Sequence, residues 1–306
     1  MKKPMSALSQ ETRELRTVLF DSARWNDFKY RDDDIVIVTW GKSGTTWTQQ
    51  IVGQLVLGAP EGISATNESP WLDCRFSPLE ETFEQLEAQT HRRYIKTHLP
   101  VDSLPFSDRA KYIYVGRDVR DIAWSAYNHQ AAFTQGTLDA FNELPGRDSP
   151  PLIHPPCGVR EYYHSFLETG EAPGFQLAPI WEHVQGWWDV KHLPNVLMVH
   201  FNNLKSDMAG EIRRIAGFLN IEIDDGLWPA ILEHCSFEYM QQESAKSEML
   251  EEFFKGGGKT FIHKGTNGRW KDVLNQDEIA ICDEIAAQRL SQECAHWLNT
   301  GETPNE

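Results

Sequence analysis

The chain has 306 residues, 40% of them hydrophobic, and a formal net charge of −16 at pH 7. This length and composition are enough for the core of a single large domain. The negative charge disfavours nucleic acid and anionic membranes as partners, and no apolar run reaches the roughly 18 residues that span a bilayer. The amino-terminal sequence lacks the apolar stretch of a signal peptide, so we expect a soluble, cytoplasmic protein.

The five cysteines are odd in number and never form a CxxC pair. This argues against a disulfide framework and against a zinc site, and it fits a reducing cytosol. We therefore expect no metal. Because the bulk charge repels anions, an anionic ligand would have to be held by a local group of donors.

Apolar runs along the chain have the length of β-strands and are nearly continuous, as in strands that are buried on both faces. They lie at residues 35–40, 93–98, 111–116 and 195–201. Helical patterns alternate with them, at residues 45–58, 119–133, 177–193, 209–220 and 277–298. The last pattern opens with a capping box of Asn275 and Glu278. The alternation predicts an α/β fold in which helices flank a mostly parallel central sheet with a P-loop-like nucleotide-binding core.

The predicted organisation is an amino-terminal extension over residues 1–30 and one domain over residues 31–300. Within this domain, residues 135–174 are rich in proline and glycine and too long for an ordinary connection. We interpret them as an inserted loop or lid. Three tryptophans at residues 181, 187 and 188 have helical spacing, which favours core packing over ligand contacts.

The segment TWGKSGTTWTQQ, residues 39–50, follows the first predicted strand and opens the first predicted helix. Its glycines, Gly41 and Gly44, allow the backbone to come close to a ligand. The unpaired N–H groups at the start of the helix point at whatever is bound there. We expect that ligand to be an anion.

The spacing of this loop differs from GxxxxGK[ST], the phosphate-binding loop of ATP-dependent proteins. In that loop the lysine follows the last glycine, whereas Lys42 precedes Gly44 and no glycine stands at the required upstream offset. A second stretch, GGGKT at residues 256–260, has Phe253 at the upstream position and follows no predicted strand. We discard it as a nucleotide loop.

The KSGTTW loop and six further motifs resemble the cytosolic sulfotransferases, which use 3'-phosphoadenosine 5'-phosphosulfate (PAPS). These motifs occur in the family's order: KTHLP (96–100), YVGRDVRDIAWSAY (114–127), WEHVQGWW (181–188), VLMVHFNNLK (196–205), HCSFEYM (234–240) and FIHKGTNGRWK (261–271). Together they cover most of the chain from about residue 34 to residue 271. The resemblance implies a PAPS-dependent sulfotransferase that modifies a hydroxyl of a small, fairly hydrophobic acceptor and leaves adenosine 3',5'-bisphosphate (PAP).

Three residues are candidates for the catalytic residues of this family. Lys42, beside the helix N-terminus, can stabilise the charge that grows on the leaving nucleotide, and the resemblance assigns it this role. Lys96 and His98 are two positions apart on a strand, so both side chains leave the same face near its carboxyl end. The resemblance implies that His98 is the general base, a task that suits an imidazole.

The resemblance also implies how the nucleotide is held. Thr45, Thr46 and the loop N–H groups contact the 5'-phosphate, and cations and a hydroxyl suit the 3'-phosphate. Aromatic faces pack on the adenine. The full set of expected cofactor-binding residues is Lys42, Ser43, Gly44, Thr45, Thr46, Trp47, Arg117, Ser125, Phe201, Phe237, His263, Lys264 and Gly265.

Three positions depart from the family's pattern. His263 stands in place of a usual arginine, which weakens a bidentate phosphate contact. Phe201 stands in place of a usual tyrosine, which removes a hydroxyl. Arg269 stands where the family's GDWK motif carries an aspartate. We expect a somewhat altered cofactor affinity.

Aromatic residues fall in the regions where the family binds its acceptor. The expected acceptor-binding residues are Trp71, Tyr127, Phe133 and Tyr239. Such a lining suits a hydrophobic hydroxyl compound. A phenol is the first choice, because its acidic hydroxyl is the easiest for His98 to deprotonate.

Other interpretations of the same residues stay open. Lys96 alone fits a solvated lysine at a strand end, and His98 alone fits a buried histidine bonded to backbone. Arg117 fits an ion-pair partner of Asp118 or Asp121. As a whole the chain also fits a P-loop kinase of small molecules, which would require Mg-ATP, or a catalytically idle protein that binds PAP.

Overall fold

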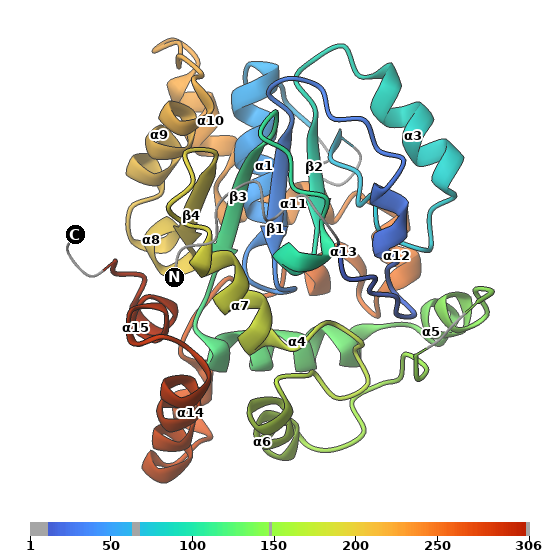
Figure 1. The fold of residues 1–306 in the computed structure, drawn as a ribbon, viewed down its shortest axis with the longest axis vertical. Coiled ribbons are helices and arrows are strands. Elements are labelled where there is room, and N and C mark those ends of the chain that lie inside the picture. Colours follow the sequence, from blue (N-terminus) through green and yellow to red (C-terminus); the bar gives the residue numbers. More distant parts are fainter. Residues whose placement is uncertain (1–11, 63–67, 147–148, 304–306) are drawn as a thin grey trace.

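The computed structural model describes residues 12–62, 68–146 and 149–303. At its centre lies a sheet of four parallel strands in the order β2-β1-β3-β4 (Figure 1). The strands are β1 (Ile35–Thr39), β2 (Tyr94–Thr97), β3 (Lys111–Gly116) and β4 (Val196–His200). Each lies within one of the four apolar runs, so the predicted α/β fold with a parallel sheet is confirmed.

Helices flank this sheet. The α-helices of the described residues are α1 (Thr45–Leu57), α3 (Leu79–Ala88), α4 (Val119–Ala132), α5 (Gln135–Asn142), α6 (Val159–Thr169), α7 (Ile180–Asp189), α8 (Phe201–Ser206), α9 (Met208–Leu219), α10 (Trp228–His234), α11 (Phe237–Ser244), α12 (Glu248–Phe253), α13 (Gly257–Phe261), α14 (Gln276–Arg289) and α15 (Gln292–Thr300). Short 3-10 helices are η2 (Ser22–Trp25), η3 (Val101–Ser103) and η4 (Arg269–Asp272).

The strands are mostly apolar because their side chains alternate between two buried clusters. Ile35 and Ile37 pack in a cluster with residues of α1 and α9, whereas Val36 and Val38 pack in a larger cluster with residues of α7. Every residue of β1 is buried. Burial on both faces removes the polar alternation of a half-exposed strand. The tryptophans at residues 181, 187 and 188 lie in the larger cluster, which confirms their predicted role in the core.

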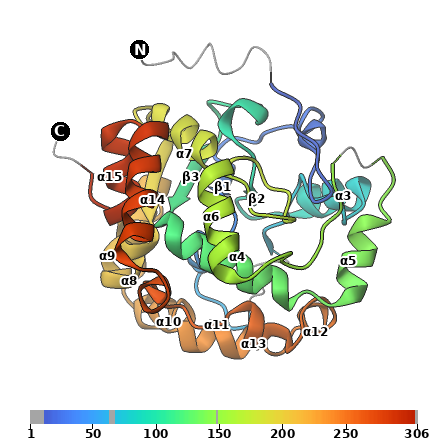
Figure 2. The same ribbon diagram turned by 90° about the horizontal axis from the view of Figure 1, so that it is seen from below.

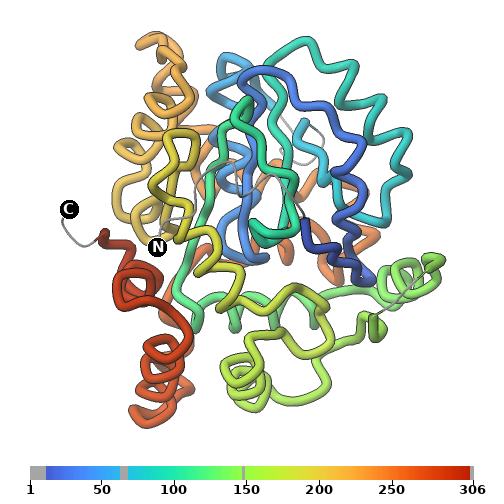
Figure 3. Tube along the Cα trace, viewed as in Figure 1, coloured from blue at the N-terminus to red at the C-terminus, as the bar shows by residue number. Residues whose placement is uncertain are grey.

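The strands end at one edge of the sheet, where the helices that follow them begin. β1 leads into α1, β3 into α4 and β4 into α8. In Figures 1 and 3 this is the lower edge of the sheet. Ligands of open α/β sheets bind at the carboxyl ends of the strands, so this edge is the expected place for a site.

A row of short helices lies beside this edge. In Figure 2, α10, α11, α13 and α12 follow one another along one side of the molecule, and α7 lies on the opposite side. Packing contacts join α13 to α4 and α12 to α5. Two helices of the row therefore pack on α4 and α5, which follow β3 in the chain.

Part of the predicted insertion belongs to the core. Residues 135–174 include α5 and α6, and α6 packs on α4. Tyr162, Tyr163 and Phe166 of α6 are buried, and the ring of Phe166 lies 5.2 Å from that of Trp40. Because α6 presents these rings at helical spacing, it is held against the domain by apolar burial.

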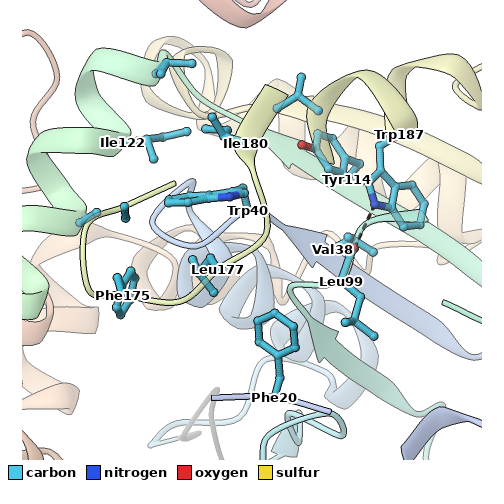
Figure 4. Packing of buried hydrophobic residues seen from close by; sticks show 14 of the residues in the cluster. Phe20, Val38, Trp40, Leu99, Tyr114, Ile122, Phe175, Leu177, Ile180 and Trp187 are labelled. Carbon is cyan, nitrogen blue, oxygen red and sulfur yellow. Dashed lines mark hydrogen bonds between the residues drawn. The ribbon is translucent and has the colours of Figure 1, made fainter. Parts of the chain in front are cut away.

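Trp40 fixes the chain at the point where β1 ends. Figure 4 shows its ring between Ile122 of α4 and the segment that contains Phe175 and Leu177. The indole N–H donates to the carbonyl oxygen of Ala178 at 2.6 Å. The loop that follows Trp40 therefore starts from a rigid anchor.

One predicted helix is wrong in its extent. The pattern over residues 277–298 forms two helices, α14 and α15, because Leu290 is extended and Ser291 caps α15 by accepting from the N–H of Cys294. A serine cap starts a new helix where the chain has left the previous one. The predicted capping box of Asn275 and Glu278 is confirmed at the start of α14.

Candidate active site

The loop after β1 has the backbone of an anion-binding turn. Lys42 and Gly44 have positive φ angles of 64° and 114°. Gly44 is the N-cap of α1 and offers no side-chain cap, so the first N–H groups of the helix keep their capacity to bind a ligand. A Cβ at Gly44 would lie 2.9 Å from Cδ2 of Phe201, so the turn fits glycine at this position.

This loop borders a cavity of about 700 Å³ at the carboxyl edge of the sheet. Ser43, whose side chain is buried, does not line the cavity, and neither do Tyr127 and Tyr239. The structure therefore brings together in one place most of the residues that the sequence proposed. Those that line the cavity are Lys42, Gly44, Thr45, Thr46, Trp47, Trp71, Lys96, His98, Arg117, Ser125, Phe133, Phe201, Phe237, His263, Lys264 and Gly265.

Helical geometry explains why the two tyrosines lie elsewhere. Tyr127 comes two positions after Ser125 on α4, and residues two apart on a helix do not share a face. Its ring packs edge-on against Tyr162 of α6 at 5.4 Å. Tyr239 on α11 stacks on the ring of His234 at 4.5 Å. Both rings serve packing between helices.

His98 is held in one tautomer by the end of β1. Its Nδ1 lies 2.8 Å from the carbonyl oxygen of Thr39 and 3.1 Å from the hydroxyl oxygen of the same residue. A carbonyl only accepts, so Nδ1 carries the proton and Nε2 presents a lone pair. Burial lowers the pKa of His98 well below 6.5, and Lys96 adds to this effect. The imidazole is therefore neutral at pH 7 and able to accept a proton.

Lys96 and Trp71 form the wall beside His98. The Nζ of Lys96 lies 4.3 Å from the centre of the Trp71 ring, and that ring meets the His98 ring edge-on at 5.0 Å. Trp71 is fixed by its indole N–H, which donates to Asp73 at 2.7 Å. Burial lowers the pKa of Lys96, and Cys74 and Asp73 counteract this shift. A cation thus lies next to the imidazole.

Lys42 reaches from the loop to α4. Its Nζ lies 3.0 Å from Nδ1 of His129 and 5.4 Å from the centre of the Phe261 ring. Burial, together with the charges of Arg117 and Lys96, lowers the pKa of Lys42 to about 7. An anionic ligand would oppose this shift, because its charge favours the protonated amine.

Arg117 ties the loop to the segment before η4. It donates to the carbonyl oxygen of Lys42 at 3.0 Å, to the carbonyl oxygen of Thr266 at 3.2 Å, and to Oδ1 of Asn267 at 3.1 and 2.7 Å. The guanidinium also lies over the ring of Phe201, 4.2 Å from its centre. These contacts fix the loop after β1 and the segment before η4, which are remote in sequence, relative to each other.

The ion pair that the sequence left open for Arg117 does not form. Asp118 pairs with Arg120 instead, at 2.7 Å. Asp121 accepts a hydrogen bond from the N–H of Gly268 at 2.7 Å. Among the residues that the structure describes, Arg117 therefore lines the cavity without an ion pair to a carboxylate.

Aromatic rings form a slot next to the loop. The rings of Trp47 and Phe201 meet edge-on at 5.5 Å, and the indole N–H of Trp47 donates to the carbonyl oxygen of Cys235 at 2.8 Å. A Cβ at Gly265 would lie 2.6 Å from Phe237, so the backbone there approaches that ring closely. Such a slot suits a planar ligand group.

Two of the departures from the family's pattern meet in space. Nη1 of Arg269 lies 3.5 Å from Nδ1 of His263, and both residues line the cavity together with Lys264. Burial lowers the pKa of His263, and the charges of Arg269 and Lys264 add to this effect. Arg269 therefore supplies a cation at the place where His263 is uncharged.

Sequence reasoning missed His129 and part of the apolar wall around it. His129 lies four positions after Ser125, and residues four apart share a helix face, so the spacing on the predicted helix was a usable signal. Phe254 and Phe261 come from the end of α12 and from α13, short elements that show no periodic pattern. Only the fold brings them to the cavity.

No group of three or more His, Cys, Asp or Glu side chains is arranged to hold a metal ion in residues 12–62, 68–146 and 149–303. Within the same ranges, no helix combines the length and the apolar composition that a membrane crossing requires. The donors that line the cavity are ammonium, guanidinium, amide and hydroxyl groups, which are the partners of an anion.

Comparison with known proteins gives the family. A family model described as the sulfotransferase domain matches residues 32–293. A glycolipid sulfotransferase of Mycobacterium bovis is 33% identical over 286 residues, with 86% of each chain covered. The solved structure of retinol dehydratase in a complex with retinol and PAP has a TM-score of 0.69 at 23% identity and covers 89% of this chain and 85% of that chain. For mouse sulfotransferase SULT7A1 complexed with PAP the values are 0.65 and 22%, with 90% of each chain covered. This chain belongs to the sulfotransferase domain family.

Proposed function

We propose that this chain transfers a sulfuryl group from PAPS to the hydroxyl of a small, fairly hydrophobic acceptor, by in-line transfer with His98 as the general base. The observation that carries the proposal is the 2.8 Å contact of Nδ1 of His98 with the carbonyl oxygen of Thr39, which leaves Nε2 as the proton acceptor of a residue that lines the same cavity as Lys42 and the N-terminus of α1. The binding of PAP by retinol dehydratase and by mouse SULT7A1 supports PAPS as the donor.

The cavity has the donors that two phosphate groups require. The N–H groups of α1 with the hydroxyls of residues 45–46 would hold the 5'-phosphate. Ser125 and Lys264 would hold the 3'-phosphate, and Arg269 would provide the second cation in place of His263. Three donors from separate elements suit a dianionic group.

The aromatic slot would take the adenine, with Trp47 and Phe237 as its walls and Phe201 beside them. A guanidinium has five N–H groups, and Arg117 uses four of them within the protein. One N–H stays available for a phosphate. Arg117 would therefore contribute mainly by fixing the loop against the segment that contains Lys264.

The residues around His98 fit the chemistry of transfer. PAPS, when bound, supplies the sulfuryl group. Nε2 of His98 would take the hydroxyl proton of the acceptor, and the carbonyl of Thr39 would stabilise the imidazolium through Nδ1. Lys42 would stabilise the negative charge that grows on the leaving nucleotide, and Lys96 the charge on the transferring group. The Trp71 ring, edge-on to the imidazole at 5.0 Å, would cover one side of it.

The apolar part of the cavity supports a hydrophobic acceptor. Phenylalanine rings line it next to His129, and Phe76 and Met249 at its border are 39% and 42% exposed. An acceptor could enter across these apolar side chains and present its hydroxyl to His98. The retinol bound by retinol dehydratase is an acceptor-sized molecule of this polarity. A hydrophobic phenol or alcohol is the class of acceptor that we propose, and the cytoplasm is the proposed location of the protein.

Transfer of radiolabelled sulfate from PAPS tests the proposal. The full-length chain is incubated with a panel of phenols and alcohols that differ in apolar length, and mass spectrometry identifies the product. We expect sulfated product with the wild type and none with His98→Ala. Stabilisation by PAP without any transfer would favour an idle binding protein. A thermal shift with Mg-ATP and none with PAP would favour a kinase.

A further inference from the structure

His129 is a titratable side chain in the cavity that the proposed transfer does not use. It lies on α4, four positions after Ser125, and its Nδ1 is 3.0 Å from Nζ of Lys42. Four phenylalanine rings surround it, with ring centres 4.9 to 5.9 Å from that of the imidazole: Phe133, Phe175, Phe254 and Phe261. An imidazole is thus the polar group of an otherwise aromatic wall.

When Lys42 is protonated, the contact has one consistent proton arrangement. An ammonium group only donates, so Nδ1 of His129 accepts and its proton lies on Nε2. Burial lowers the pKa of His129 well below 6.5, and the charges of Lys42, Lys96 and His98 act in the same direction. His129 is therefore neutral at pH 7, and the hydrogen bond to the ammonium is charge-assisted.

Lys42 depends on this contact for its position. Within the described ranges, His129 is the hydrogen-bond partner of the Lys42 ammonium, whose other close contact is the face of the Phe261 ring. A lysine side chain has four rotatable bonds and loses considerable entropy when it is fixed. The charges of Arg117 and Lys96 repel the ammonium and cannot hold it.

We propose that His129 is a positioning residue for Lys42. Its Nδ1 holds the ammonium where the nucleotide loop meets the aromatic wall around His129. The inference rests on the proposed role of Lys42 in sulfuryl transfer. A hydrogen bond to a neutral acceptor orients the ammonium without cancelling its charge, whereas a carboxylate at this place would neutralise it.

Two substitutions isolate the acceptor atom. His129→Phe keeps a ring in the aromatic wall and removes the acceptor. His129→Asn restores an acceptor, because its amide oxygen is as far along the side chain as Nδ1 of histidine. The first readout is the pH midpoint of Lys42 acetylation by trace acetic anhydride, measured by mass spectrometry on the full-length chain. Lys111, at the amino end of β3, is the internal control.

We expect the midpoint for Lys42 to fall by about one to two pH units in His129→Phe, since a charge-assisted hydrogen bond stabilises the ammonium by that much. In His129→Asn it should return to within about half a unit of wild type. An unchanged midpoint in His129→Phe, or the same midpoint in both variants, would overturn the proposal. This readout needs no acceptor, so it stands even if the wild type shows no transfer.

The second readout separates turnover from nucleotide binding. With an acceptor that the wild type sulfates, we expect kcat to fall about 10- to 100-fold in His129→Phe and to recover to within about threefold in His129→Asn, while the Kd for PAP stays within about threefold. A rise of kcat or of PAP affinity in His129→Phe would show that His129 competes with the nucleotide for Lys42, and this would overturn a positioning role.

Discussion

The pKa of Lys42 predicts that PAP binding is coupled to proton uptake. In the free protein, burial and then the charges of Arg117 and Lys96 lower this pKa to about 7. A bound bisphosphate favours the ammonium form, so the pKa rises in the complex. A group whose pKa rises on binding takes up protons at pH values between its free and bound pKa, and in this range affinity falls as pH rises.

The size of the effect follows from the free pKa of about 7. At that value the amine is about half deprotonated at pH 7 and about nine-tenths deprotonated at pH 8. If the pKa in the complex is above about 9, binding takes up about 0.5 proton at pH 7 and about 0.9 proton at pH 8. The Kd for PAP should then rise about fivefold between these two pH values.

Isothermal titration calorimetry measures the uptake directly. PAP is titrated at pH 8 in buffers of different ionisation enthalpy. The slope of the observed binding enthalpy against the buffer ionisation enthalpy gives the number of protons taken up on binding. Lys42→Met should lose about 0.9 proton of uptake and most of the pH dependence of Kd. Lys111→Met, a change outside the cavity, should keep both. Equal uptake in wild type and Lys42→Met would refute the reasoning.

Three further substitutions test separate parts of the site. His98→Asn should lower kcat at least about 100-fold with PAP affinity little changed, because it removes the base; a milder loss in the steady-state assay would contradict that role. Lys264→Ala should weaken PAP more than adenosine 5'-monophosphate in calorimetry, and equal losses would count against a 3'-phosphate contact. Gly44→Ala should destabilise the fold by about 1 to 3 kcal/mol in denaturant titration, owing to its positive φ and the contact with Phe201; an unchanged midpoint would show that the loop relaxes.

The strands were predictable because each lies in a nearly continuous apolar run, and the parallel sheet followed from their alternation with helices. The break between α14 and α15 was not predicted, because the apolar pattern continues across Leu290 and Ser291 and the cap that separates the helices is a single hydrogen bond. The core role of α6 was hidden for another reason. Its surroundings are rich in proline and glycine, and this obscured the helical spacing of Tyr162, Tyr163 and Phe166.

Site residues that belong to sequence motifs were predictable, whereas those that reach the cavity only through tertiary packing were not. Lys42, Lys96 and His98 stand in motifs, and the structure places all three at one cavity. Tyr127 was assigned to the acceptor from its neighbourhood in sequence, although its position on the helix turns it towards α6. The tautomer of His98 could not be read from sequence, since it depends on a carbonyl of another strand.

The charges of the molecule are distributed in a way that favours an anion in the cavity, although the chain as a whole is acidic. Two other buried arginines have carboxylate partners: Arg93 pairs with Asp34 at 2.6 Å and Arg120 with Asp118 at 2.7 Å. Within the described ranges, Lys42, Lys96 and Arg117 form no ion pair, and burial lowers the pKa of each. Cations that are gathered without counterions repel one another and lose hydration, and a polyanion that enters relieves both costs. The net charge therefore does not decide the ligand, because the fold gathers Lys42, Lys96 and Arg117 at one cavity although the chain as a whole is acidic.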